Sequence, residues 1–353
     1  MEEYKEINEE EKEGVRPGPR RALLAVLALT AIAALIAFLL WESGILAGLW
    51  DLVQGRDSRG WRRWDWQELG LRMTLEVRAE EGVRSLTLKV ALPPSRPGFQ
   101  ETAFRLEPEP AEWLREGERE YAVYRFRPAP TALTVVLEGE VILRRMDLET
   151  ALRRGGLPGQ GDLSPFLVPE GKVESDAPEI RALASEVRGS TDREMAVEIC
   201  RLVGRLLEYR RDSENGGAVE ALRRGWGNCT DYSRLMTALC RARGIPARTV
   251  RGLLVERSIT TEEFADHLHR WVEVYLEGCG WVTFDPTMAD GDPGMVERLP
   301  PFHLVLGTGE GDPGLRGGDV WYAESEGGRV EVKWAVEVTI LDKGKGDVPG
   351  RPQ

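Results

Sequence analysis

Apolar and polar residues alternate along three stretches in the first half of the chain. Apolar side chains occupy nearly every second position over 69–77, 86–92 and 133–143, with Gly139 as an expected bulge in the last stretch. Alternation with a period of two is typical of strands that bury one face. Turns containing proline and glycine separate the stretches, and no helical periodicity lies between them. The pattern predicts an antiparallel β-sandwich over 66–148.

A continuous apolar run precedes these strands. Residues 22–41 are uncharged and mainly apolar, and a helix of about twenty such residues spans the hydrocarbon core of a bilayer. A cleaved signal peptide is the competing interpretation, but it would have a shorter apolar region followed by a small-residue cleavage site. Trp41, Glu42 and Ser43 follow here instead. We therefore predict a retained transmembrane helix over 22–41.

The charges that flank this run indicate its orientation. Arg20 and Arg21 directly precede it, and the next basic residue is Arg56. Positive charge favours the cytoplasmic side. We expect a disordered cytoplasmic N-terminus over 1–21 and a catalytic domain outside the cytoplasm, anchored in the cell membrane by a single pass.

A juxtamembrane linker over 42–65 is expected to follow the membrane helix. Tryptophans gather at its end, at Trp61, Trp64 and Trp66. Indole rings suit both the headgroup region of a membrane and the underside of a sheet. Both placements stay open for these three residues.

Two stretches in the second half have helical periodicity. Thr191 and Glu194 form a capping box that opens a helix, and a second helix is expected over 230–243, ended by Gly244 and Pro246. The apolar stripes of the two helices consist of Ala196, Ile199, Cys200, Val203, Leu206 and Leu207, and of Tyr232, Leu235, Met236 and Leu239. Each stripe recurs at three- and four-residue spacing, as an amphipathic helix requires.

Cys229 directly precedes the second helix, behind a Gly-Trp-Gly-Asn turn. The first N–H groups of a helix have no partner within it, and the positive end of the helix dipole lies there. Both effects favour a thiolate over a thiol. The same N–H groups are natural hydrogen-bond donors to an oxyanion.

A hairpin is predicted downstream of the cysteine. Residues 269–276 and 281–285 each alternate between two faces, and the turn 277–280 joins them. An antiparallel pairing brings His269 and Asp285 to within about a residue or two of opposite positions. Cysteine, histidine and aspartate are the parts of a thiol nucleophile, its base and its orienter.

Four motifs occur in order in this part of the chain. They are Gly-x-Cys-x-Asp-Tyr at 227–232, Gly-Ile-Pro-Ala-Arg at 244–248, His-x-Trp-x-Glu-Val-Tyr at 269–275 and Gly-Trp-x-x-Phe-Asp-Pro-Thr at 280–287. Over roughly 165–290 the chain resembles the transglutaminase-like (papain-related) superfamily, in the manner of a membrane-anchored microbial member.

The resemblance implies an α+β fold with a transglutaminase-like (papain-like) catalytic core. It implies Cys229 as nucleophile, His269 as general base and Asp285 as orienter. Crosslinking relatives use a tryptophan upstream of the cysteine for the oxyanion, and no counterpart is evident here. Tyr209 lies in that region, and we interpret it as a core aromatic residue that closes its helix.

The remaining layout follows from composition. We expect a linker over 149–164, the catalytic core over 165–300, C-terminal strands that complete the core over 301–343, and a disordered tail over 344–353. The β-sandwich contributes no candidate site residue. A chain that begins near Gly161 is therefore expected to fold by itself.

The other histidines and cysteines have structural interpretations. His267 is an alternative base, and His303 is expected to be structural. Cys200 and Cys240 lie on apolar stripes and are expected to be buried, although a disulfide between them is an alternative, while Cys279 in the hairpin turn needs no role.

The charged residues argue against a nucleic-acid partner and do not indicate a metal site. The formal net charge is −12, with 47 Lys and Arg against 59 Asp and Glu, which argues against nucleic-acid binding. Too few oxygen ligands cluster near 290–292 for calcium. We expect no metal and no cofactor.

Three functions are consistent with these residues. The favoured one is a membrane-anchored cysteine acyl-transfer enzyme that hydrolyses peptide or amide bonds of a peptide or protein substrate through a thioester. The first alternative is a protein-crosslinking transglutaminase with an amine acceptor. The second is a non-catalytic binding or scaffold module.

Overall fold

The structure is a computed structural model that describes residues 64–349 apart from 97, 149–150, 152–160, 292, 311–314 and 317–319. The chain divides into two compact units, Met1–Trp61 and Arg62–Gln353, and every described residue belongs to the second. The predicted membrane helix over 22–41, the N-terminus over 1–21 and most of the linkers over 42–65 and 149–164 lie outside the described residues. Among the helices of the described part, none is long and apolar enough to cross a membrane.

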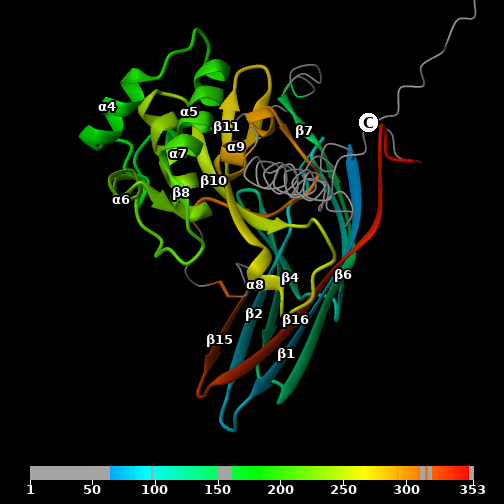
Figure 1. The fold of residues 1–353 in the computed structure, drawn as a ribbon. Helices are drawn as coiled ribbons and strands as arrows, with labels where there is room; N and C mark the ends of the chain where they lie inside the picture. Colours follow the sequence, from blue (N-terminus) through cyan, green and yellow to red (C-terminus); the bar gives the residue numbers. More distant parts are fainter. Residues whose placement is uncertain are drawn as a thin grey trace, which may run out of the picture. The chain divides into compact units, whose positions relative to one another are not determined.

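Two four-stranded antiparallel sheets are built largely from the first half of this unit. Their strand orders are β16-β1-β6-β3 and β15-β2-β5-β4 (Figure 1). The strands are β1 (Trp66–Ala79), β2 (Ser85–Leu92), β3 (Gln100–Glu107), β4 (Glu112–Glu116), β5 (Arg119–Phe126), β6 (Ala132–Arg144), β15 (Trp321–Glu326) and β16 (Val330–Gly344).

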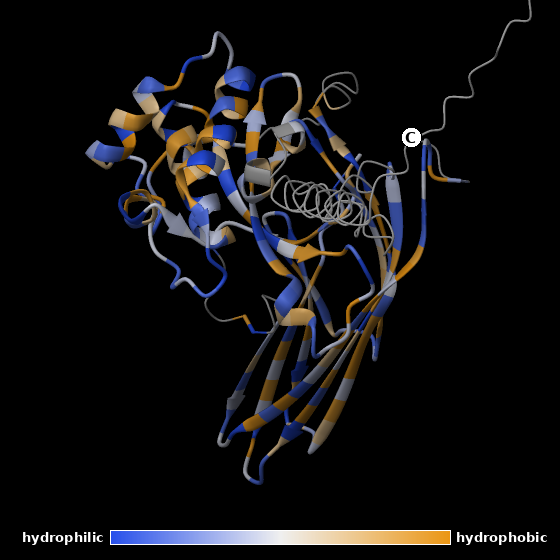
Figure 2. Cartoon of the chain, viewed as in Figure 1, coloured by the Kyte–Doolittle hydropathy of each residue, from blue (hydrophilic) through white to orange (hydrophobic). Residues whose placement is uncertain are grey.

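The apolar faces of these two sheets share one core. Leu71 and Leu75 of β1 are buried together with Leu86 and Leu88 of β2, and all four belong to the same apolar cluster. The alternation of apolar and polar residues along the long strands is visible in Figure 2. The period-two pattern of the sequence thus produces strands with one buried face, as predicted.

A third antiparallel sheet carries the candidate site. Its order is β12-β11-β10-β14. The strands are β10 (Ala247–Leu254), β11 (Leu268–Leu276), β12 (Gly280–Phe284) and β14 (His303–Thr308), and two short pairs add β7 (Met146–Asp147) with β13 (Arg298–Leu299) and β8 (Glu208–Tyr209) with β9 (Trp226–Gly227). The predicted hairpin is β11 and β12, in which Val272 lies opposite Phe284.

Helices cover this third sheet. They are α4 (Pro178–Glu186), α5 (Asp192–Leu206), α6 (Ala218–Arg224), α7 (Cys229–Ala242), α8 (Phe264–His267) and α9 (Pro286–Gly291), with the 3₁₀ turns η2 (Ser164–Phe166) and η3 (Pro293–Val296). Helix α7 is central, because it contacts β10 and β11 on one side and α4, α5 and α6 on others (Figure 1). All its residues from Thr230 to Arg241 are buried.

The helix patterns of the sequence are confirmed. Helix α7 occupies the range predicted from its apolar stripe, within one residue at each end. Helix α5 begins behind Thr191, whose hydroxyl accepts a hydrogen bond from the Glu194 N–H. The predicted capping box is only half formed, because the Glu194 carboxylate accepts from the Ser190 N–H and not from that of Thr191. Both helices bury their stripes in one cluster with the hairpin.

The C-terminal strands differ from the prediction for 301–343. Only β14 joins the catalytic sheet, next to β10. Strand β15 pairs with β2, and β16 pairs with β1 from Val330 to Gly344. The expectation that 66–148 forms a self-contained sandwich is corrected by the same finding, because two strands of the sheets come from the other end of the chain. Alternation defines the buried face of a strand and does not define its partner.

Two local predictions are also corrected. Gly139 makes no bulge, since β6 keeps its register with both neighbours. A Cβ atom at this position would lie 2.0 Å from the carbonyl oxygen of Ala103, so glycine permits a close approach of β3. The tail predicted to be disordered over 344–353 is partly ordered, because Val348 is buried against Trp66 and Ile142. Trp66 therefore packs under the sheet.

Candidate active site

The turn before Cys229 places the thiol at the first position of helix α7. Gly225 ends α6 with a left-handed φ of 71°, a conformation that favours glycine. Asn228 then caps α7, because its side-chain oxygen accepts a hydrogen bond from the Thr230 N–H at 2.9 Å. The Asp231 carboxylate accepts from the Asn228 N–H at 2.9 Å and completes a capping box. This reciprocal capping fixes the backbone on both sides of Cys229.

Asp231 also holds the loop that lies over the start of the helix. Its carboxylate accepts from Ser213 Oγ at 2.9 Å and from the Gly216 N–H at 2.8 Å, and it pairs with Arg224 at 2.6 Å. Asp231 is fully buried. A buried carboxylate with this many donors stabilises the loop only while all the donors stay in place.

The hairpin joins the imidazole to the carboxylate. His269 lies near the start of β11, and Asp285 directly follows β12. Nε2 of His269 lies 2.7 Å from Oδ2 of Asp285. The other nitrogen of His269, Nδ1, is left for Cys229, and His269 lies close enough to the thiol for each group to shift the pKa of the other.

Both oxygens of Asp285 are engaged. Oδ1 accepts from the Thr287 hydroxyl at 2.6 Å and from the Thr287 N–H at 3.0 Å. Oδ2 is shared, because Nε2 of His303 lies 3.1 Å from it in addition to His269. Asp285 is fully buried, and His303 is 1% exposed.

The electrostatics favour an ionised pair. Burial alone would lower the pKa of His269, but the charge of Asp285 and the hydrogen bonds to Asp285 and Cys229 raise it to about 10. Burial would raise the pKa of the Cys229 thiol, but His269 and the Arg270 backbone N–H bring it below its ordinary value. Burial likewise opposes ionisation of Asp285, and His269 and His303 still hold its pKa well below the usual range. A thiolate beside an imidazolium follows.

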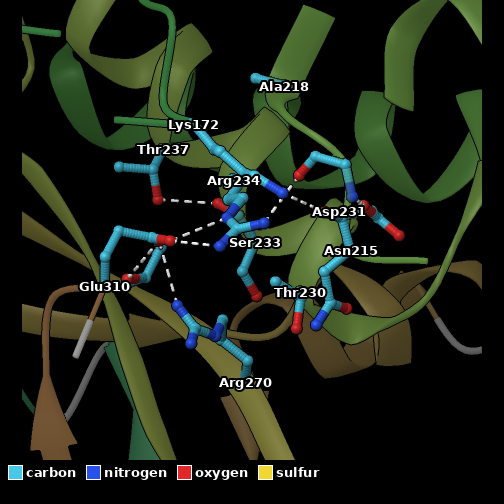
Figure 3. Close-up of polar contacts among 12 residues, drawn as sticks. Lys172, Asn215, Ala218, Thr230, Asp231, Ser233, Arg234, Thr237, Arg270 and Glu310 are labelled. Atoms are coloured by element: carbon cyan, nitrogen blue, oxygen red, sulfur yellow. Dashed lines mark hydrogen bonds and ion pairs between the residues drawn. The ribbon is translucent and has the colours of Figure 1, made fainter. Parts of the chain in front are cut away.

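An ion-pair cluster connects the helix to the sheet beside the thiol. Glu310 pairs with Arg234 of α7 at 2.9 Å and with Arg270 of β11 at 3.0 Å (Figure 3). Thr249 of β10 donates to the same carboxylate at 3.3 Å, and Arg234 reaches the Gly216 carbonyl at 2.7 Å. These contacts fix the first turns of α7 against the strand that carries His269.

The other predicted candidates do not join the triad. Nδ1 of His267 lies 2.9 Å from the Leu254 carbonyl oxygen, so it is engaged away from the thiol. Tyr209 is no core residue, since it is 48% exposed. It pairs with Gly227 in β9, beside the turn that leads to the thiol, and burial and the nearby Cys229 raise the pKa of its hydroxyl.

All four cysteines are free. Cys200 and Cys240 are buried, as their apolar stripes predicted, Cys279 is buried as well, and Cys229 is half-buried. The alternative of a disulfide between Cys200 and Cys240 is therefore wrong for this structure. The thiol at the helix start is the one that solvent can reach most readily.

His303 is the residue that sequence reasoning underestimated. It was expected to be structural, and it lies on the carboxylate of the triad instead. No local motif marks His303. The pairing of β14 with β10, which are distant in the sequence, places it beside Asp285. The one available signal was its rarity, since the chain has only three histidines.

One group of side chains has the composition of a metal site. Ligand atoms of His269, Asp285 and His303 lie within 4.8 Å of one another. Both imidazoles direct Nε2 at the same carboxylate oxygen, at 2.7 Å and 3.1 Å. These are hydrogen-bond distances. We therefore interpret the group as hydrogen-bonded.

Thiol, imidazole and carboxylate are thus arranged in a papain-like order across one helix and one hairpin. Residues 181–286 match the family model of the transglutaminase-like superfamily. This segment is thus similar to a transglutaminase-like domain, and the described fold is a mixed α/β fold with several antiparallel sheets.

Individual relatives are more distant. Over 75 residues the chain is 37% identical to the uncharacterized protein YebA of Bacillus subtilis (strain 168), covering 19% of this chain and 10% of that protein. The chain thus spans about a tenth of the length of this curated relative.

Solved structures resemble the fold at low sequence identity. A protein from Cytophaga hutchinsonii, described as a candidate cysteine protease, has a TM-score of 0.49 and 20% identity, covering 80% of this chain and 94% of that one. The periplasmic domain of TgpA from Pseudomonas aeruginosa has a TM-score of 0.32 and 19% identity, covering 64% and 90%. Neither similarity supports a statement about activity.

Proposed function

We propose that the protein is a cysteine acyl-transfer enzyme that hydrolyses amide or peptide bonds, with Cys229 as nucleophile, His269 as acid and base, and Asp285 as orienter. The observation that carries the proposal is the buried His269–Asp285 hydrogen bond of 2.7 Å beside Cys229 at the start of α7, where His269 counters the effect of burial and lowers the pKa of the thiol. An isolated cysteine beside a histidine is common, whereas a base that is itself oriented by a buried carboxylate suits nucleophilic catalysis.

The proposed reaction has two halves. The Cys229 thiolate attacks the carbonyl carbon of the substrate, and the backbone N–H of Cys229 is the proposed donor to the oxyanion that forms, because the Asn228 side chain occupies the Thr230 N–H. Nδ1 of His269 then gives its proton to the leaving nitrogen, the carbon–nitrogen bond breaks, and a thioester remains on Cys229. Water attacks this thioester while Nδ1 takes a proton from the water, and a carboxylic acid leaves with the thiolate restored.

The assay for this proposal distinguishes hydrolysis from transfer to an amine. Purified full-length protein in detergent is incubated with a glutamine-containing protein, with and without a fluorescent primary amine. We expect ammonia or new amino termini without incorporated amine, because the proposal makes water the acceptor. Cys229→Ala should remove this turnover, and Cys279→Ala should keep it.

Incorporated amine would contradict hydrolysis and would favour the crosslinking alternative. The binding-module alternative would be supported if the wild-type protein and Cys229→Ala were equally inactive on every substrate while the wild-type protein bound one of them.

The membrane anchor is part of the same proposal. Residues 22–41 are uncharged and apolar, and Arg20 and Arg21 precede them, which suits a single-pass protein with the catalytic unit outside the cytoplasm. We expect the protein to fractionate with membranes and a protease added to intact cells to remove the catalytic unit. Cleavage only after lysis would show the opposite orientation.

A further inference from the structure

The polar contact of the buried His303 side chain goes beyond what packing alone requires. It is 1% exposed, lies at the start of β14, and its ring meets that of Trp271 edge to face with centroids 5.0 Å apart. Its Nε2 lies 3.1 Å from Oδ2 of Asp285, the same oxygen that Nε2 of His269 approaches at 2.7 Å. Two imidazoles thus converge on one carboxylate oxygen.

The second nitrogen of His303 indicates which atom carries the proton. Among the described residues, the buried Nδ1 of His303 has no hydrogen-bond partner. A proton on Nδ1 would bury an unpaired N–H group, which is costly. A proton on Nε2 instead forms the hydrogen bond to Asp285, so the geometry places the donated proton on Nε2.

We propose that His303 is a positioning residue, which donates a second imidazole hydrogen bond to Oδ2 of Asp285 and so holds this oxygen on His269. The inference rests on the proposed function, since it concerns the Cys229–His269 pair of that reaction. Thr287 fixes Oδ1 and His303 fixes Oδ2. The carboxylate can then neither rotate nor take the proton of His269.

His303 also shares the charge of Asp285. A carboxylate that donates part of its charge to a second hydrogen bond attracts the imidazolium of His269 less strongly and repels the thiolate of Cys229 less. Glu256, which follows β10, is a second acidic group that interacts with His303 among the described residues. Without the Nε2–H donor, the full charge of Asp285 would act on Cys229, so thiolate formation would need a higher pH.

The test is the rate of Cys229 alkylation by iodoacetamide as a function of pH, on the full-length protein. In His303→Phe, we expect the acid-side midpoint to rise by roughly half a pH unit, which is about threefold slower alkylation on that side. His303→Gln should return the midpoint to the wild-type value, because its amide nitrogen matches the position of Nε2. A purely structural role would change the rate by the same factor at every pH.

A second measurement uses only the wild-type protein, so its result does not depend on whether a variant folds. Long-range ¹H–¹⁵N correlation spectra of the wild-type protein report which imidazole nitrogen carries the proton. We expect His303 to be protonated on Nε2 and not on Nδ1 at neutral pH. A proton on Nδ1, stoichiometric metal in the purified protein, or equal midpoints for folded His303→Phe and wild-type protein would each overturn the proposal. Failure of the proposed function is a separate result, since incorporated amine in the substrate assay would contradict hydrolysis while the difference in alkylation midpoint between wild-type and His303→Phe protein would remain.

Discussion

Iodoacetamide near neutral pH is expected to alkylate Cys229 well before Cys200, Cys240 or Cys279. Only the thiolate reacts, so the rate follows the thiolate fraction and the access of the reagent. Burial raises the pKa of the Cys240 thiol to about 12, and it raises the pKa values of Cys200 and Cys279 as well. The pKa of Cys229 is lowered. Each pKa unit that separates two thiols corresponds to about a tenfold difference in thiolate population at a pH below both values.

Substitutions of His269 and Asp285 should slow the alkylation of Cys229 by different amounts, in a fixed order. His269→Ala removes the cation and the hydrogen bond that hold the thiolate, so alkylation at neutral pH should slow by roughly tenfold or more. Asp285→Asn should slow alkylation less, because the imidazole remains. Only its orientation is less well fixed and its positive charge less stabilised. His267→Ala is the matched control and should leave the rate unchanged, since His267 bonds to the Leu254 carbonyl oxygen.

Mass spectrometry of peptides from a time course identifies the modified cysteine. Earlier labelling of Cys240 or Cys279 would contradict the assignment of the nucleophile. The same holds if His267→Ala abolishes labelling while His269→Ala has no effect, because His267 would then be the base.

Local sequence signals predicted most of the candidate site. The apolar stripe of 230–243 and the alternation of 269–276 each determine an element from neighbouring residues alone. A helix start and a hairpin bring Cys229, His269 and Asp285 together with little help from the rest of the chain. The approach of Cys229 to His269 requires only that α7 packs on β11.

Residues placed by distant pairing were not predictable in the same way. His303 reaches Asp285 because β14 pairs with β10, about fifty positions away in the sequence. Tyr209 lies beside Gly227 through a two-residue parallel pair. The pairing of β16 with β1 joins opposite ends of the unit. The sequence shows the alternation within each strand, but the sequence of one strand does not determine which strand it pairs with.

The same distant pairing changes the expected behaviour of a shortened chain. The sequence suggested that a chain beginning near Gly161 would fold. In the structure, apolar residues of the catalytic part lie in the core of the two N-terminal sheets, and they are Leu253, Val255, Ile259, Phe264, Leu304 and Leu306. Strand β16 would also lose its partner β1 along its whole length.

Polar contacts between the N-terminal sheets and the catalytic part are buried as well. The side chain of Gln100 is fully buried and accepts from the Val305 N–H at 2.8 Å while it donates to the Val305 carbonyl at 3.0 Å. Gln67 donates to the Val255 carbonyl at 2.8 Å. Glu273, on the strand that carries His269, is buried between Arg96 and Arg248. Removal of Arg96 would leave part of this buried charge uncompensated.

We therefore expect the chain 161–353 to lack a cooperative fold, whereas the chain 62–353 keeps it. Exposing a buried apolar side chain costs about 1.5–3 kcal/mol, so the six residues shared with the N-terminal sheets amount to on the order of 10 kcal/mol. That equals the whole stability of a typical domain, about 5–15 kcal/mol. The chain 62–353 is the matched control, because it retains the complete second unit.

Near-ultraviolet circular dichroism and thermal unfolding distinguish the two outcomes. The chain 161–353 should lose the tryptophan signals and show no sharp transition, as expected when packing is lost and secondary structure remains. Alkylation of Cys229 in it should no longer exceed that of Cys240, because burial of Cys240 and the His269 contact both depend on packing. A sharp transition in 161–353, with Cys229 still labelled first, would show that the catalytic sheet and its helices are stable without the sheets that share their core.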